Sequence, residues 1–125
     1  MHAFDAELVG LGAFPSVMRP RVVWAGVTEG AGMTIELAGR VDEALTALGF
    51  AREERAFSPH VTLGRVRQPR RDPSLTEALR DAARSQFGRI RVTGASLMRS
   101  ELSPRGARYS ELAAVGLGGA IGRSV

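Results

Sequence analysis

Short apolar segments of two kinds, separated by glycine and proline, constrain the fold of this chain more than any other feature. Five segments have the branched, aromatic or alternating composition typical of strands, at residues 4–14, 21–27, 57–66, 90–98 and 107–117. Residues 34–48 and 73–87 instead place apolar side chains at three- and four-residue intervals, the spacing of a helix face. The order strand, strand, helix, strand, helix, strand, strand predicts an α+β fold.

Local signals predict where some of these segments end. Asp72 is a typical N-cap, and Pro73 is a typical first residue of the second helix. That helix is expected to continue until Gly88 ends it. The first strand is expected to break at Gly10 and Gly12, because glycine weakens the interior of a strand.

Length and composition predict one domain over residues 1–125. A chain of 125 residues with 44% hydrophobic and 24% charged residues is typical of a globular domain. There is no cysteine, which excludes disulfides and thiolate metal sites. No apolar run is long enough to span a bilayer and no signal peptide opens the sequence, so we expect a cytoplasmic protein. The tail, residues 118–125, is expected to be frayed.

All 17 basic residues are arginine, and the formal net charge is +4. The planar guanidinium suits phosphate, so the position of the arginines matters more than their number. Four of them lie close together at the end of one strand segment and just after it, at Arg65, Arg67, Arg70 and Arg71. They form either a positive rim that attracts a polyanion or a solvated strand end in an arginine-rich protein.

His60 and Thr62 occupy alternate positions of a predicted strand, so their side chains share one face. Imidazole is the side chain best suited to move protons near neutral pH, and a threonine hydroxyl can donate to phosphate. The alternative is a hydrogen-bonded structural histidine beside a threonine that simply fits a strand. In a regular strand Arg65 would point away from His60, unless a bulge near Gly64 turns it back.

The stretch FSPHVTLGRV, residues 57–66, resembles the second His-x-Thr-x motif of the 2H phosphoesterases. The resemblance is closest to the RNA 2′,3′-cyclic phosphodiesterases, also called 2′-5′ RNA ligases. Residues 8–27, 48–67 and 95–117 are similar to this family in the same order. The resemblance implies a 2H phosphoesterase-like fold with antiparallel sheets and flanking helices.

The family resemblance also implies a mechanism in which two His-x-Thr-x motifs face each other. One histidine protonates the leaving oxygen of a 2′,3′-cyclic phosphate, and the other accepts a proton from water. Carried over by position, His60 is the proton acceptor and Thr62 binds phosphate. Arg65 and Tyr109 are implied to bind the substrate, an RNA or nucleotide with a cyclic phosphate end. No metal or other cofactor is expected.

Two further aromatic residues have open interpretations. Trp24 and Phe14 have side chains that can stack on an RNA base. Aromatic residues in a strand and its turn more often belong to the core, and we favour the core for Trp24.

The sequence departs from the family because the first motif is missing. The only other histidine, His2, has no threonine two residues later. The chain resembles the family fold with its N-terminal part removed, so we expect weak or no activity alone. The incomplete sheet edge is expected to favour a homodimer. The alternatives to an enzyme are a non-catalytic RNA or nucleotide-phosphate binding module and an inactive fragment.

Overall fold

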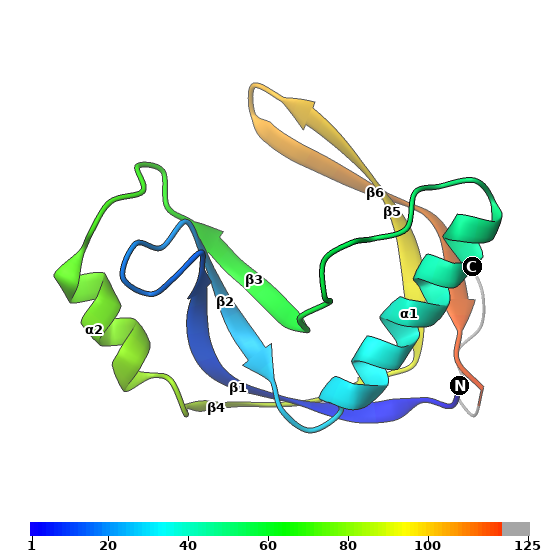
Figure 1. The fold of residues 1–125 in the computed structure, drawn as a ribbon, viewed down its shortest axis with the longest axis horizontal. Coiled ribbons are helices and arrows are strands. Elements are labelled where there is room, and N and C mark those ends of the chain that lie inside the picture. Colours follow the sequence, from blue (N-terminus) through cyan, green and yellow to red (C-terminus); the bar gives the residue numbers. More distant parts are fainter. Residues whose placement is uncertain (119–125) are drawn as a thin grey trace. The chain divides into compact units, whose positions relative to one another are not determined.

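The computed structural model describes residues 1–118, and two helices lie between strands there as the sequence predicts (Figure 1). The elements are β1 (Phe4–Phe14), β2 (Val22–Val27), α1 (Ala31–Ala47), β3 (His60–Arg65), α2 (Pro73–Asp81), β4 (Gln86–Val92), β5 (Gly94–Ser103) and β6 (Gly106–Gly116). The predicted frayed tail lies outside the described residues, apart from Gly118, which forms a β-bridge with His2.

The strands form two sheets. Four strands are arranged in the order β3-β2-β1-β4, and β5 pairs with β6 as a two-stranded antiparallel hairpin. The β1–β2 and β2–β3 pairs are both antiparallel. The strand that begins at His60 is therefore an edge strand, with a paired neighbour on one side only (Figure 1).

The chain divides into two compact units. Asp5–Ile90 form one unit, which contains both helices and the β1–β2–β3 part of the sheet. The other unit consists of Met1–Phe4 and the chain from Arg91 onward, including the β5–β6 hairpin. The single domain expected over residues 1–125 stays a prediction.

The second helix is held by an N-cap and by contacts of two buried residues. Asp72 is its N-cap as predicted, because its carboxylate accepts a hydrogen bond from the Leu75 amide at 3.2 Å. Leu79 is only 2% exposed, and the buried Thr76 donates its hydroxyl to the Val17 carbonyl at 2.6 Å. These contacts anchor α2 to the loop that follows β1. Helix α1, by contrast, has no buried residue.

The prediction that α2 continues to Gly88 is wrong. The helix ends at Asp81, and Gly88 lies inside β4. The backbone of β1 captures the chain immediately after the helix: the Leu11 amide donates to the Ala82 carbonyl at 3.0 Å, and the Gly10 amide donates to the Ser85 carbonyl at 2.7 Å. These non-local hydrogen bonds override the helical spacing of the side chains.

The predicted break in the first strand is also wrong. β1 continues through both glycines to Phe14, with an irregular register between Val9 and Leu11. Gly10 sits at this bulge with a φ of 79°, and a Cβ atom there would collide with the Ala83 carbonyl oxygen. Glycine therefore permits a close approach between β1 and the segment after α2 rather than ending the strand.

The segment 90–98, predicted as one strand, is divided between two sheets. β4 ends at Val92 and β5 begins at Gly94. Thr93 lies between them, and its carbonyl accepts a hydrogen bond from the Leu117 amide at 2.8 Å. The side-chain pattern continues across this change of sheet, so it gives no signal of the boundary.

Candidate functional site

Pairing with β2 places the His60 and Thr62 side chains on one face of the sheet, as predicted. His60 lies opposite Gly26, and Thr62 lies opposite Trp24. Directly opposed residues in paired strands share a face, and Trp24 and Gly26 are alternate residues of β2. His60 also lies opposite a residue without a side chain, which leaves room for the imidazole.

A β-bulge brings Arg65 to the same face. The register of β3 on β2 shifts so that Thr62 pairs with Trp24 and Gly64 pairs with Val23, leaving Leu63 without a partner. Arg65 then lies opposite Val22, which is on the Trp24 face of β2. In a regular strand Arg65 would point away from His60. The extra residue places the Arg65 side chain on the same face as His60 instead.

The backbone just before β3 orients the imidazole of His60. Its Nδ1 lies 2.6 Å from the Ser58 carbonyl oxygen. A carbonyl oxygen only accepts hydrogen bonds, so this contact requires the proton on Nδ1. In the neutral ring the other nitrogen, Nε2, is then an acceptor, which is the protonation state that a general base needs.

Two aromatic rings from neighbouring strands surround this imidazole. Phe14 meets His60 edge to face, with ring centroids 5.1 Å apart and an angle of 89°. Trp24 lies 6.2 Å from the His60 ring and 5.2 Å from the Phe14 ring. A Cβ atom at Gly12 would collide with the Trp24 ring, so the indole lies across Gly12. The favoured assignment of Trp24 to the core missed this position beside the histidine.

The buried indole nitrogen of Trp24 destabilises the fold. Within the described residues its Nε1 atom is buried and has no hydrogen-bond partner. An unsatisfied buried donor destabilises a fold by about 1–3 kcal/mol. The ring contacts with Phe14 and His60 offset part of this cost, which suggests that the position of the ring matters more than its N–H group.

A pocket opens beside His60. It has a volume of about 390 Å³ and is lined by Phe14, Glu53, Arg55, Phe57, Ser58 and His60. Most of these residues come from the loop that leads into β3. This loop lies within residues 48–67, which resemble the family, but the sequence predicts no site residue in the loop itself. The pocket depends on tertiary contacts, which the sequence does not show. The only signal for it in the sequence is the aromatic content of residues 50–57.

Other predicted residues lie in a second pocket and on β6. Arg67 and Arg70 line a separate pocket of about 260 Å³ with Pro20 and Leu75. Tyr109 lies on β6, in the other compact unit, opposite Ser100, and is 69% exposed. The substrate-binding roles of Arg65 and Tyr109 stay predictions.

The described residues contain no group of three or more histidine, cysteine, aspartate or glutamate side chains that could hold a metal ion. The expectation that no cofactor is needed stays a prediction. Of the helices in residues 1–118, none is long and apolar enough to cross a membrane.

The three side chains on the β3 face have complementary chemistry. His60, Thr62 and Arg65 are all exposed, and no carboxylate in residues 1–118 pairs with Arg65. The arrangement combines a proton acceptor, a hydroxyl donor and a fixed positive charge, which suits a phosphate group. These features define an α+β protein in which a histidine, a threonine and an arginine are exposed on one face of an edge strand.

A family model confirms the resemblance seen in the sequence. The model for LigT-like phosphoesterases matches residues 27–109, and the chain belongs to this family. The RNA 2′,3′-cyclic phosphodiesterase of Aeropyrum pernix is 42% identical over 109 residues, covering 87% of this chain and 62% of that protein. The one from Aquifex aeolicus is 37% identical over 117 residues, covering 93% and 62%.

The fold agrees with a solved structure. The crystal structure of TT0787 of Thermus thermophilus matches with a TM-score of 0.64 and 32% identity, covering 93% of this chain and 61% of that chain. The predicted 2H phosphoesterase-like α+β fold is confirmed. The chain spans about three fifths of the length of the curated relatives named above.

Proposed function

We propose that the β3 site hydrolyses RNA 2′,3′-cyclic phosphate ends to 2′-phosphates. The observation that carries the proposal is the orientation of His60, whose Nδ1 is bonded to the Ser58 carbonyl while Thr62 and Arg65 share its face. The names of the relatives from Aeropyrum pernix and Aquifex aeolicus, both RNA 2′,3′-cyclic phosphodiesterases, support the same reaction.

In the proposed reaction, Nε2 of His60 accepts a proton from a water molecule. The water oxygen attacks phosphorus, the bond from phosphorus to the 3′ oxygen breaks, and that oxygen takes up a proton from solvent. The product has a 3′ hydroxyl and a 2′-phosphate. Thr62 donates to one phosphate oxygen, and Arg65 balances the charge that develops on the others.

Only one His-x-Thr-x motif is present in this sequence, so no residue is assigned as the acid for the leaving oxygen. A general acid contributes about 10²–10⁴ in rate. We therefore propose a rate lower by that factor than the rate of a relative with both motifs. A second copy of the chain, paired at the β3 edge, is one source of the missing group. A cytoplasmic location stays a prediction.

The test is turnover of an RNA that ends in a 2′,3′-cyclic phosphate, by the 125-residue chain and its His60→Ala variant. We expect slow formation of 2′-phosphate that His60→Ala abolishes, at a rate below that of the Aeropyrum pernix relative. A non-catalytic binding module would give no turnover, and His60→Ala would only weaken RNA binding. Turnover that does not depend on His60 would overturn the proposal.

The reduced rate has its own test. Sedimentation of the same sample distinguishes a monomer from a dimer. A monomer that matches the rate of the Aeropyrum pernix relative would contradict the predicted impairment. A rate that rises with protein concentration in step with dimer formation would support a site completed by a second copy.

A further inference from the structure

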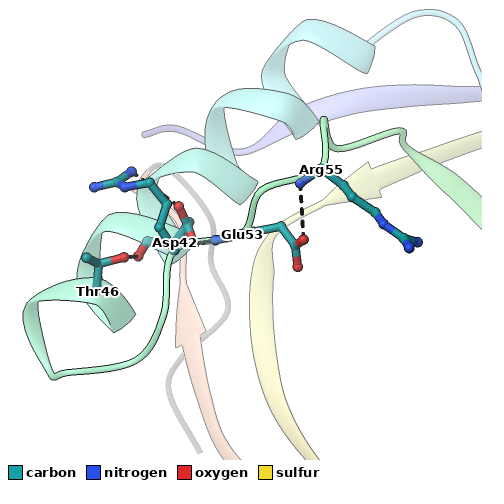
Figure 2. A network of polar contacts seen from close by, with 5 residues as sticks. Asp42, Thr46, Glu53 and Arg55 are labelled. Atoms are coloured by element: carbon teal, nitrogen blue, oxygen red, sulfur yellow. Dashed lines mark hydrogen bonds and ion pairs between the residues drawn. The ribbon is translucent and has the colours of Figure 1, made fainter.

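The loop before β3 is tied to helix α1 through one carboxylate. Asp42 accepts a hydrogen bond from the Glu53 amide at 3.0 Å (Figure 2). It also accepts one from the Arg52 guanidinium at 3.3 Å. The Thr46 hydroxyl donates to the Asp42 carbonyl at 2.7 Å. Both oxygens of the Asp42 carboxylate are thus used to hold the start of the loop.

The next residues of the loop are ordered from Glu53. One oxygen of its carboxylate, Oε1, accepts a hydrogen bond from the Arg55 amide at 3.2 Å. The side chain of Arg55 extends away from the Asp42 network (Figure 2). In residues 1–118 no hydrogen bond or ion pair uses the second Glu53 oxygen or the Arg55 guanidinium. An acceptor and a donor therefore remain for a ligand.

Both groups line the pocket beside His60, together with two phenylalanine side chains. Phe14 is 37% exposed and Phe57 is 47% exposed. A pocket of about 390 Å³ with aromatic faces, one carboxylate and one guanidinium matches a nucleobase, which has a flat π surface and a polar edge. A purely apolar ligand would leave both charged groups desolvated without partners.

We propose that this pocket binds the base of the nucleotide whose phosphate lies at His60, and that Glu53 selects a base with an exocyclic amino group over uracil. The inference rests on the proposed function, since it places the phosphate at His60. Glu53 accepts from the amino group, and Arg55 donates to a neighbouring ring nitrogen or carbonyl oxygen of the base. Asp42 is a positioning residue that acts through the Glu53 backbone.

Cytosine and uracil make a sharp comparison because they have the same size and stacking surface. Cytosine presents an amino group where uracil presents a carbonyl oxygen. A carboxylate attracts the first and repels the second, and a matched polar contact to a base edge discriminates by about tenfold. We therefore expect cytidine 2′-phosphate to bind about tenfold more tightly than uridine 2′-phosphate.

The experiment measures the affinity of both nucleotides for the 125-residue chain by calorimetry, with the His60 ring signals followed by NMR. Glu53→Gln should reduce the preference for cytidine to less than about threefold. Glu54→Gln is the matched control, because this neighbour is exposed and does not line the pocket. Asp42→Asn should also reduce the preference, with unchanged affinity for inorganic phosphate.

The outcomes separate the inference from the function. Equal affinities for the two nucleotides, with His60 signals that shift in both titrations, would overturn base selection while the proposed function stands. A preference for cytidine that survives in Glu53→Gln would also overturn it. If neither nucleotide shifts the His60 signals, both the proposed function and the base pocket are contradicted.

Discussion

Strands β3 and β6 each carry a residue predicted to touch substrate, and the two residues differ in the partners that they have within their own compact unit. His60 has a carbonyl partner at Ser58 and contacts with the rings of Phe14 and Trp24. Tyr109 is aligned with Ser100 by strand pairing, yet among the described residues of its own compact unit it has no side-chain bond or ring contact. Backbone pairing sets the register of a residue, whereas side-chain neighbours set its orientation.

The difference follows from where each strand lies. β3 pairs with β2, which in turn pairs with β1, so the rings of two inner strands reach the β3 face. β5 and β6 form a two-stranded sheet, in which each strand has one neighbour. A two-stranded sheet gives each residue cross-strand neighbours on one side only, so it offers fewer side-chain contacts within the sheet.

The largest expected effect is the loss of the proton acceptor. His60→Ala should lower the residual rate of 2′-phosphate formation by about 10²–10⁴, because general base catalysis contributes that factor. Tyr109→Ala should lower the rate far less. Single-turnover assays with saturating RNA compare the two variants, and losses of similar size would remove the distinction between β3 and β6.

The space beneath Trp24 gives the next largest effect. Gly12→Ala places a Cβ atom against the indole, and overpacking of this kind costs about 1–3 kcal/mol in the free energy of unfolding. Gly64→Ala is the matched control, since a Cβ atom there meets nothing within 4 Å. Urea unfolding measures both variants. A Gly12→Ala chain as stable as Gly64→Ala would contradict the described packing of the aromatic face.

The bulge at Leu63 leads to a prediction about phosphate affinity. Arg65→Gln should weaken binding of a nucleoside 2′-phosphate by about tenfold, because it removes a charged hydrogen bond on the His60 face. Arg67→Gln should change the affinity by less than about twofold, since Arg67 lines the separate pocket. Calorimetry at constant salt compares them. A larger loss for Arg67→Gln would mean that the bulge does not direct Arg65 to the site.

The smallest effect is expected at Tyr109. Tyr109→Phe removes only the exposed hydroxyl and keeps the aromatic ring that is predicted to contact the substrate, so the affinity for a nucleoside 2′-phosphate should change by less than about twofold. The same calorimetric series includes this variant. A tenfold loss would show that β6 contributes to substrate binding as strongly as β3.

Local sequence patterns predicted those features that depend on neighbouring residues. The two-residue period placed His60 and Thr62 on one face, and the helix-start signal at Asp72 was correct. The helical spacing that led to Gly88 failed because β1 captures the chain at Ala82. The spacing of side chains along the sequence cannot predict a backbone hydrogen bond to a distant strand.

The parts of the site that depend on tertiary contacts were harder to predict. Arg65 needed a bulge whose position is set by pairing with β2. Glu53 and Arg55 became pocket residues because Asp42, ten or more positions earlier, holds their loop. Trp24 has the sequence environment of a core residue, and only its position over Gly12 places it beside the imidazole.

The central claim is that His60, Thr62 and Arg65 act together on one phosphate. The most direct measurement is an NMR titration of the isotope-labelled chain with cytidine 2′-phosphate, observing the His60 ring nitrogens, the Thr62 amide and the Arg65 guanidinium. We expect all three to shift with one dissociation constant while the proton remains on Nδ1 of His60. Shifts confined to Arg67 and Arg70, with His60 unchanged, would contradict the account.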